Sequence, residues 1–354
     1  MSDEPPTKKT RHEAPLDPED RESEKVMPVT SMSNIPSNPH PLTPHILELD
    51  FAAIIPENFF IIVYGVRRTG KTHAVSVLLE SVKDRFDFAY LFSTTANLHK
   101  GQKGELDFDM IRPEAKFEGY QEDILERIMA RQRKVLEFNN ACEKKRDRKP
   151  NRTLLIFDDF VHETAIRYSK VFTQLPVLGR HYELSVICLS QGYSQVASGG
   201  LNKATRQNAD LVMTFLPRNS NDLERISEWY LTKAKFENMW LTKSLCSEEH
   251  QLMAVDLSRP HLVEYEDYVY KYQAPAEVPK YELGIVQWKI AREEAKRQRR
   301  AALEAKMQDA QSYFLGTSEL EIRSKLNEAT GIPTGREKMT MFDAFRLAGL
   351  TPSN

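Results

Sequence analysis

The strongest constraint on this chain is one short stretch, residues 59–74, in which an apolar run, a glycine-containing turn and a helical pattern follow one another. The apolar run Phe59–Tyr64 is typical of a buried strand. The eight residues after it match the spacing G-x-x-x-x-G-K-[ST], and they are Gly65, Val66, Arg67, Arg68, Thr69, Gly70, Lys71 and Thr72. The stretch therefore predicts a phosphate-binding P-loop between a strand and a helix.

The chemistry of such a loop gives its residues roles. Glycines let the backbone fold around an anion, so that successive N–H groups and the positive end of the helix face the phosphates of ATP. We expect all eight loop residues to bind the nucleotide, with Lys71 at the β- and γ-phosphates and the Thr72 hydroxyl on Mg²⁺. The alternative is a glycine turn that matches the pattern by chance.

A second apolar strand is predicted over Thr153–Phe157, and it ends in two acids, Asp158 and Asp159. Open α/β sheets bind ligands at the carboxyl ends of their parallel strands, so Asp158 should lie next to the P-loop. We expect Asp158 to hold Mg²⁺, directly or through water, and Asp159 to polarise the attacking water. An apolar strand capped by two aspartates at a turn is the structural alternative.

Apolar strands and helical stretches alternate along the rest of the chain, which indicates an α/β fold with a largely parallel sheet. We predict a P-loop NTPase fold (RecA-like, ASCE) with flanking helices. Its parts are a disordered tail over 1–45, an ATPase domain over 46–275 and a C-terminal extension with one long helix over 276–354. Further strands are expected at Phe88–Ser93, Leu184–Leu189, Leu211–Phe215, Leu252–Leu257, Leu262–Tyr265 and Tyr268–Tyr272, and helices at Tyr120–Lys145, Thr164–Leu178, Leu223–Leu241 and Tyr281–Phe314.

A polar amide, Gln191, follows the strand predicted at Leu184–Leu189. At the tip of a core strand it could sense the γ-phosphate or orient the hydrolytic water. A strand-end glutamine that faces solvent is the alternative.

Composition limits the remaining possibilities. The chain has 49 basic and 51 acidic residues and a formal net charge of −2, so a contact with nucleic acid must be local. Its three widely spaced cysteines favour a reducing compartment. No apolar run approaches the roughly 20 residues that a membrane helix needs, and the first residues lack the apolar core of a signal peptide. We expect a soluble, intracellular protein with no membrane-spanning segment.

The predicted C-terminal helix is a candidate for such a local contact with DNA. Its cations are Lys289, Arg292, Lys296, Arg297, Arg299 and Arg300. Cations this dense can neutralise phosphates on DNA. A solvated arm or a coiled-coil partner is the more common role of such a helix, and a solvated loop is the more common role of the basic run 144–152.

Four motifs together resemble the genome-packaging ATPases of nucleocytoplasmic large DNA viruses, which belong to the FtsK–HerA superfamily of DNA-pumping motors. The motifs are Gly65–Thr72, Leu154–Asp159, Gly179–His181 with the strand ending in Ser190–Gln191, and Arg206-x-Asn208-x-Asp210 before a strand. The resemblance spans about residues 59–272.

This resemblance implies a homo-oligomeric ring, hexameric or pentameric, that hydrolyses ATP to move double-stranded DNA into a preformed capsid. A capsid or portal-like viral protein would be its partner, in the host cytoplasm, a viral factory or the virion. The roles given above to Lys71, Thr72, Asp158, Asp159 and Gln191 follow from the resemblance as well. An arginine reaching the γ-phosphate of a neighbouring subunit is also implied, and Arg206 is preferred over Arg180.

Other functions fit a P-loop because a fold does not fix a function. A kinase or other nucleotide-handling enzyme would transfer phosphate to a metabolite, and a nucleotide-gated scaffold would not hydrolyse ATP. A helicase or recombination ATPase is the nearest alternative. Gln191 favours a hydrolase, because a phosphate-transfer enzyme has no water to orient.

Overall fold

The computed structural model describes residues 44–94, 108–159, 164–191, 201–259, 263–277 and 280–316 of the chain. The chain divides into two compact units, residues 1–287 and 288–354. Nearly all of the predicted tail over 1–45 lies outside the described residues, and the domain boundaries drawn from the sequence stay a prediction.

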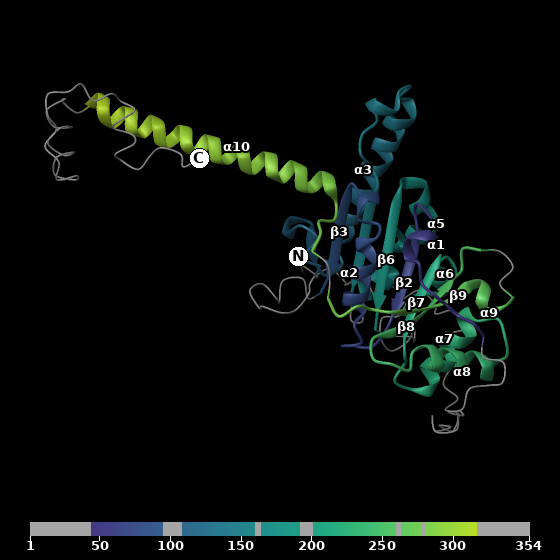
Figure 1. Cartoon of the computed structure of the whole chain (residues 1–354). Helices are drawn as coiled ribbons and strands as arrows, with labels where there is room; N and C mark the ends of the chain where they lie inside the picture. The colour runs from purple at the N-terminus through teal and green to yellow at the C-terminus, as the bar shows by residue number, and fades with distance from the viewer. Residues whose placement is uncertain are drawn as a thin grey trace, which may run out of the picture. The chain divides into compact units, whose positions relative to one another are not determined.

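The first unit is built on a nine-stranded sheet, and Figure 1 labels several of its strands. The strand order is β1-β9-β8-β7-β2-β6-β5-β3-β4. Neighbouring strands are parallel, except that β8 runs antiparallel to both β7 and β9. The strands are β1 Leu47–Glu48, β2 Phe60–Tyr64, β3 Phe88–Ser93, β4 Lys116–Glu118, β5 Thr153–Asp158, β6 Leu184–Ser190, β7 Leu211–Phe215, β8 Gln251–Asp256 and β9 Val269–Gln273. The predicted α/β fold with a mostly parallel sheet is confirmed.

Helices cover both faces of this sheet, because its central strands are apolar on both sides. In β2, Phe60, Ile62 and Tyr64 belong to one buried cluster, whereas Ile61 and Val63 belong to the other. Helices α3, α5, α7 and α8 contribute to the first cluster, and α1 and α2 to the second. The helices are α1 Phe51–Ile54, α2 Lys71–Glu80, α3 Glu122–Ala141, α4 Thr164–Tyr168, α5 Lys170–Leu178, α6 Lys203–Gln207, α7 Ser220–Tyr230, α8 Lys235–Leu245, α9 Tyr265–Tyr268 and α10 Ile285–Gly316, with single 3₁₀ turns at Lys83–Arg85, Pro113–Ala115, Lys145–Asp147 and Gly179–Tyr182.

Two helices predicted as continuous are each broken in two. The helix expected over Thr164–Leu178 is interrupted at Ser169, whose hydroxyl accepts from the Phe172 backbone N–H at 3.0 Å and caps α5. The helix expected over Leu223–Leu241 is interrupted between α7 and α8. There the buried amide of Asn238 donates to the Lys233 carbonyl at 2.9 Å and fixes the connection. In both cases a polar side chain satisfies backbone groups that a continuous helix would have paired.

The two strands expected after β8 are only partly correct. The strand predicted over Leu262–Tyr265 is wrong at residues 263–265, because residues 263 and 264 belong to no strand and Tyr265 begins α9; Leu262 lies outside the described part. The period-two spacing of Tyr268, Tyr270 and Tyr272 predicts one shared face. Tyr268 instead ends α9 and packs in the first cluster, while Tyr270 and Tyr272 pack with the second.

The long C-terminal helix predicted from the sequence is present as α10, which begins at Ile285. Gly284 precedes it with φ +81°, a backbone conformation that favours glycine. Each of the six cations named above is exposed on α10. Within the ranges that the structure describes, no helix combines the length and the apolar character needed to cross a bilayer.

Candidate active site

The predicted P-loop connects β2 to α2 and folds back over the end of β2. The Gly65 N–H donates to the Ser190 carbonyl at 3.1 Å, so the loop begins as a continuation of the β2–β6 pairing. The Thr69 hydroxyl donates to the Val66 carbonyl at 2.9 Å and closes the turn. Gly70 has φ +95° and is the N-cap of α2. The loop thus ends where unpaired N–H groups of the first helical turn face the direction that suits an anion.

Space inside the loop is limited at its first glycine. A Cβ atom on Gly65 would lie 2.7 Å from the Thr69 hydroxyl oxygen and 3.1 Å from Cγ of Lys71. Contacts this short require the loop to shift, so glycine at this position follows from close packing within the loop.

Lys71 is held inside the loop and is only 8% exposed. Its ammonium donates to the carbonyl oxygens of Gly65 at 2.6 Å and of Val66 at 3.1 Å. Burial lowers the pKa of Lys71 below its ordinary value, and the carboxylates of Asp158 and Asp159 counter this shift. The two acids therefore lie close enough to act electrostatically on the loop lysine.

The sheet order explains how the acids approach the loop. β6 lies between β2 and β5, and the pairings Val63–Leu189 and Leu189–Asp158 place the ends of the three strands level. Asp158 ends β5. Asp159 follows with φ +57°, which is uncommon for a residue other than glycine, and its carbonyl accepts from the Thr94 hydroxyl at 3.2 Å. The chain thus turns sharply after Asp158, and both half-buried acids stay at the carboxyl edge of the sheet.

Gln191 contacts the second of these acids directly. Its side-chain Nε2 donates to Asp159 Oδ1 at 2.5 Å. β6 lies between β2, which leads into the P-loop, and β5, which ends in Asp158. Gln191, which follows β6, therefore lies between the P-loop and the two acids. The structure therefore brings Lys71, Asp158, Asp159 and Gln191 together.

The residues present fit a magnesium ion that is shared with a nucleotide. Thr72 lies in the first turn of α2 and Asp158 at the end of β5. In the part of the chain that the structure describes, no group of three or more His, Cys, Asp or Glu side chains could hold a metal on its own. One carboxylate and one hydroxyl suit Mg²⁺, which takes its remaining ligands from phosphates and water.

The structure does not bring the two candidate arginines to this loop. Arg180 precedes β6 and Arg206 precedes β7, both of which run parallel to β2, so they lie toward the opposite edge of the sheet. Arg206 donates to the Leu201 carbonyl at 2.6 Å and stacks over the Trp229 ring at 3.9 Å. Within the P-loop, Arg67 and Arg68 are exposed. A role for Arg180 or Arg206 at a neighbouring subunit stays a prediction.

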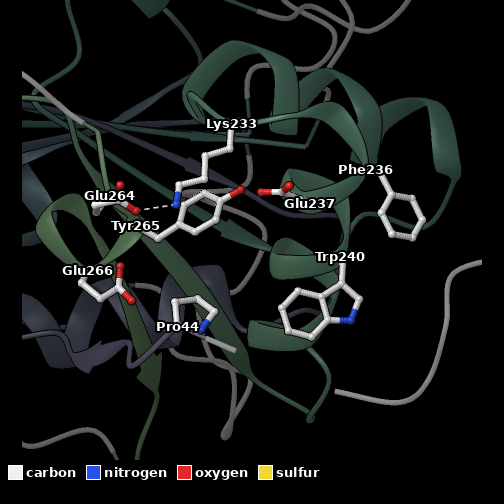
Figure 2. A pocket seen from close by; sticks show the side chains of 8 residues that line it. All are labelled: Pro44, Lys233, Phe236, Glu237, Trp240, Glu264, Tyr265 and Glu266. Carbon is white, nitrogen blue, oxygen red and sulfur yellow. Dashed lines mark hydrogen bonds and ion pairs between the residues drawn. The ribbon is translucent and has the colours of Figure 1, made fainter. Parts of the chain in front are cut away.

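A separate hollow of about 280 Å³ lies beside α8 and α9 (Figure 2). Within it, the Lys233 ammonium pairs with Glu264 at 2.5 Å and lies 4.8 Å from the centre of the Tyr265 ring. Its lining residues are Pro44, Lys233, Phe236, Glu237, Trp240, Glu264, Tyr265 and Glu266. None of them belongs to the P-loop or to β5 and the acids at its end, so this hollow is distinct from the candidate active site.

One residue at the loop was not predicted. His250 Nδ1 lies 3.2 Å from the Thr69 carbonyl oxygen, although the two residues are 181 positions apart. A lone histidine before a strand carries no local signal for such a contact, and only the arrangement of β8 in the sheet reveals it.

Comparison with known proteins gives the family. The family model described as Poxvirus A32 protein matches residues 47–253. The chain belongs to the poxvirus A32 protein family. This membership confirms the recognition of a viral packaging-type ATPase, and with it ATP as the nucleotide and ATP hydrolysis as the activity.

Solved structures give more distant likenesses. The genome packaging NTPase B204 from Sulfolobus turreted icosahedral virus 2, in complex with ATPγS, is 16% identical with a TM-score of 0.39, and the match covers 57% of this chain and 94% of that one. The pCW3 conjugation coupling protein TcpA, with ATPγS, is 12% identical with a TM-score of 0.42, and the match covers 62% of this chain and 60% of that one. No curated protein matches the chain.

Proposed function

We propose that this ATPase is a motor that translocates double-stranded DNA and packages a viral genome into a preformed capsid. The observation that carries the proposal is the pair formed by Gln191 and Asp159 beside the Lys71 loop. An amide and a carboxylate in contact can position one water and accept its proton, and a phosphate-transfer enzyme has no such water to position. Membership in the A32 family supports the viral role.

Each of these residues has a distinct role in ATP hydrolysis. Lys71 and the N–H groups at the start of α2 bind the β- and γ-phosphates and offset their charge. Thr72 and Asp158 would hold Mg²⁺, which would neutralise charge on the phosphate oxygens. Asp159 accepts the proton of the attacking water, and Gln191 holds the Asp159 carboxylate in place while it orients that water.

Ring assembly would complete the site. Arg180 and Arg206 lie toward the edge of the sheet opposite the P-loop, so either arginine would act on the nucleotide of a neighbouring subunit rather than on its own. Arg206 would first have to leave the Leu201 carbonyl and the Trp229 ring that it contacts. An arginine supplied in this way can raise turnover about 10³-fold or more. A homo-oligomeric ring in the host cytoplasm, a viral factory or the virion, engaged with a capsid or portal-like protein, is the assembly we propose.

Linear double-stranded DNA should stimulate ATP hydrolysis several-fold, because a motor couples turnover to movement along its track. The measurement is the steady-state rate of phosphate release with and without DNA, at fixed salt. A rate that DNA leaves unchanged would contradict the motor. Phosphate transfer to a small metabolite would favour a kinase instead, and DNA-stimulated strand separation would favour a helicase.

The exposed cations of α10 are our proposed contact with DNA phosphates. Replacing Arg297, Arg299 and Arg300 by Gln should weaken DNA binding and lower the slope of log K against log salt by about 0.9 for each lost phosphate contact. The matched variant replaces Lys144, Lys145 and Arg146, which are also exposed. If only this second variant weakens DNA binding, the contact lies at the 144–152 run and not on α10.

A further inference from the structure

We propose that His250 is a positioning residue for phosphate binding, because it holds the Thr69–Gly70 peptide so that the Gly70 N–H faces the nucleotide. Nδ1 of His250 lies 3.2 Å from the Thr69 carbonyl oxygen. The ring also packs against Gly70, where an added Cβ atom would lie 3.1 Å from the same nitrogen. This role rests on the proposed use of the Lys71 loop as the phosphate site.

The geometry of a trans peptide connects this contact to the phosphates. In a planar trans peptide the C=O of one residue and the N–H of the next point in opposite directions. A donor that holds the Thr69 carbonyl on the outside of the loop therefore turns the Gly70 N–H toward the inside. Without that donor, the peptide of a glycine with φ +95° is free to rotate, because glycine tolerates many backbone conformations.

Thr69 is consequently fixed at two points. Its side-chain hydroxyl donates to the Val66 carbonyl inside the loop, and its own carbonyl is bound from outside by His250. The next carbonyl, that of Gly70, accepts from the Ala74 N–H at 2.8 Å within α2. The Gly70 N–H is thus oriented by the protein before the nucleotide arrives, which lowers the entropic cost of binding.

The turn that carries His250 is itself well anchored. β8 runs antiparallel to β7, so it begins at the edge of the sheet where the P-loop lies. The Glu248 N–H donates to the Gln251 side chain at 3.1 Å, and the Gln251 N–H donates to the Glu248 carbonyl at 3.2 Å. From β9, the side chain of Gln273 donates to the Glu249 carbonyl at 3.0 Å. His250 itself has φ +63°, a conformation that these contacts hold in place.

The test compares nucleotides with and without a β-phosphate. His250→Ala should weaken the binding of ADP and ATPγS about five- to tenfold, the worth of one hydrogen bond, and leave the binding of AMP unchanged. His250→Asn, whose amide can place a donor near the position of Nδ1, should restore most of the affinity. His45→Ala is the matched control, because His45 is exposed and lies outside the loop contacts. Fluorescence titration of the full chain measures all three affinities.

Several outcomes would overturn the proposal. Unchanged ADP affinity in folded His250→Ala, or an equal loss for AMP and ADP, would show that the contact does not act on the β-phosphate. Failure of His250→Asn to recover affinity would exclude the hydrogen bond as the cause. A wild-type chain that binds AMP as tightly as ADP would contradict the Lys71 phosphate site itself, and that result is distinguishable from a failure confined to the His250 variants.

Discussion

Lys71→Ala should reduce ATP hydrolysis at least about 100-fold, because it removes a preorganised cation from the position where phosphate charge develops. Lys71 already lies inside the loop, bound to the Gly65 and Val66 carbonyls, and a bound triphosphate would replace those weak partners with strong ones. The variant should also lose affinity for ATP. Phosphate release and nucleotide titration, measured on the same preparation, give both quantities.

A nearby lysine provides the control for this substitution. Lys83 follows α2 and pairs with Glu80 at 2.6 Å on the surface, so Lys83→Ala should retain the wild-type rate. Thermal unfolding of both variants separates loss of chemistry from loss of fold. Near-normal turnover of folded Lys71→Ala would remove the loop from the mechanism.

Asp159→Asn should lower kcat by about 10²–10⁴-fold, the usual contribution of a general base, while ATP binding remains close to wild type. The asparagine keeps the size of the side chain and an oxygen that can accept from Gln191, so the geometry of the pair is preserved. The substitution removes the negative charge and, with it, the ability to accept a proton. Single-turnover phosphate release after a separate binding measurement distinguishes the two steps.

Two companion variants sharpen the assignment of the acids. Asp158→Asn should instead raise the Mg²⁺ concentration needed for half-maximal activity, because Asp158 is the proposed metal-side acid. Asp147→Asn, at an exposed position in the basic turn before β5, should change neither property. Asp159→Asn with a normal kcat would assign proton transfer to another group.

The centre of the site was predictable because its signals are local. The P-loop spacing, the apolar strand β5 with the two acids at its end, and Gln191 after β6 are each contained in a few consecutive residues. Parallel pairing of β2, β6 and β5 then brings their carboxyl ends together. His250 was not predictable in this way, because its contact with Thr69 depends on β8 running antiparallel at a sheet position that no local pattern specifies.

The incorrect secondary-structure predictions have a similar cause. Apolar periodicity continues through Ser169, but the hydroxyl of this serine caps α5 and also contacts Tyr120 and Glu122, which lie before and in α3. The tyrosines with period-two spacing begin at Tyr268, but this residue ends α9, and its hydroxyl lies 2.9 Å from the Thr232 hydroxyl. Both outcomes depend on tertiary partners that are distant in the sequence.

The most direct test of the account is a structure of the full chain with ATPγS and Mn²⁺, in which anomalous scattering locates the metal. We predict the γ-phosphate between Lys71 and the Asp159–Gln191 pair, with Mn²⁺ bound to the Thr72 hydroxyl and, directly or through a water, to Asp158. Nucleotide bound elsewhere, for example in the hollow beside Trp240, or phosphates beyond the reach of Lys71, would contradict it.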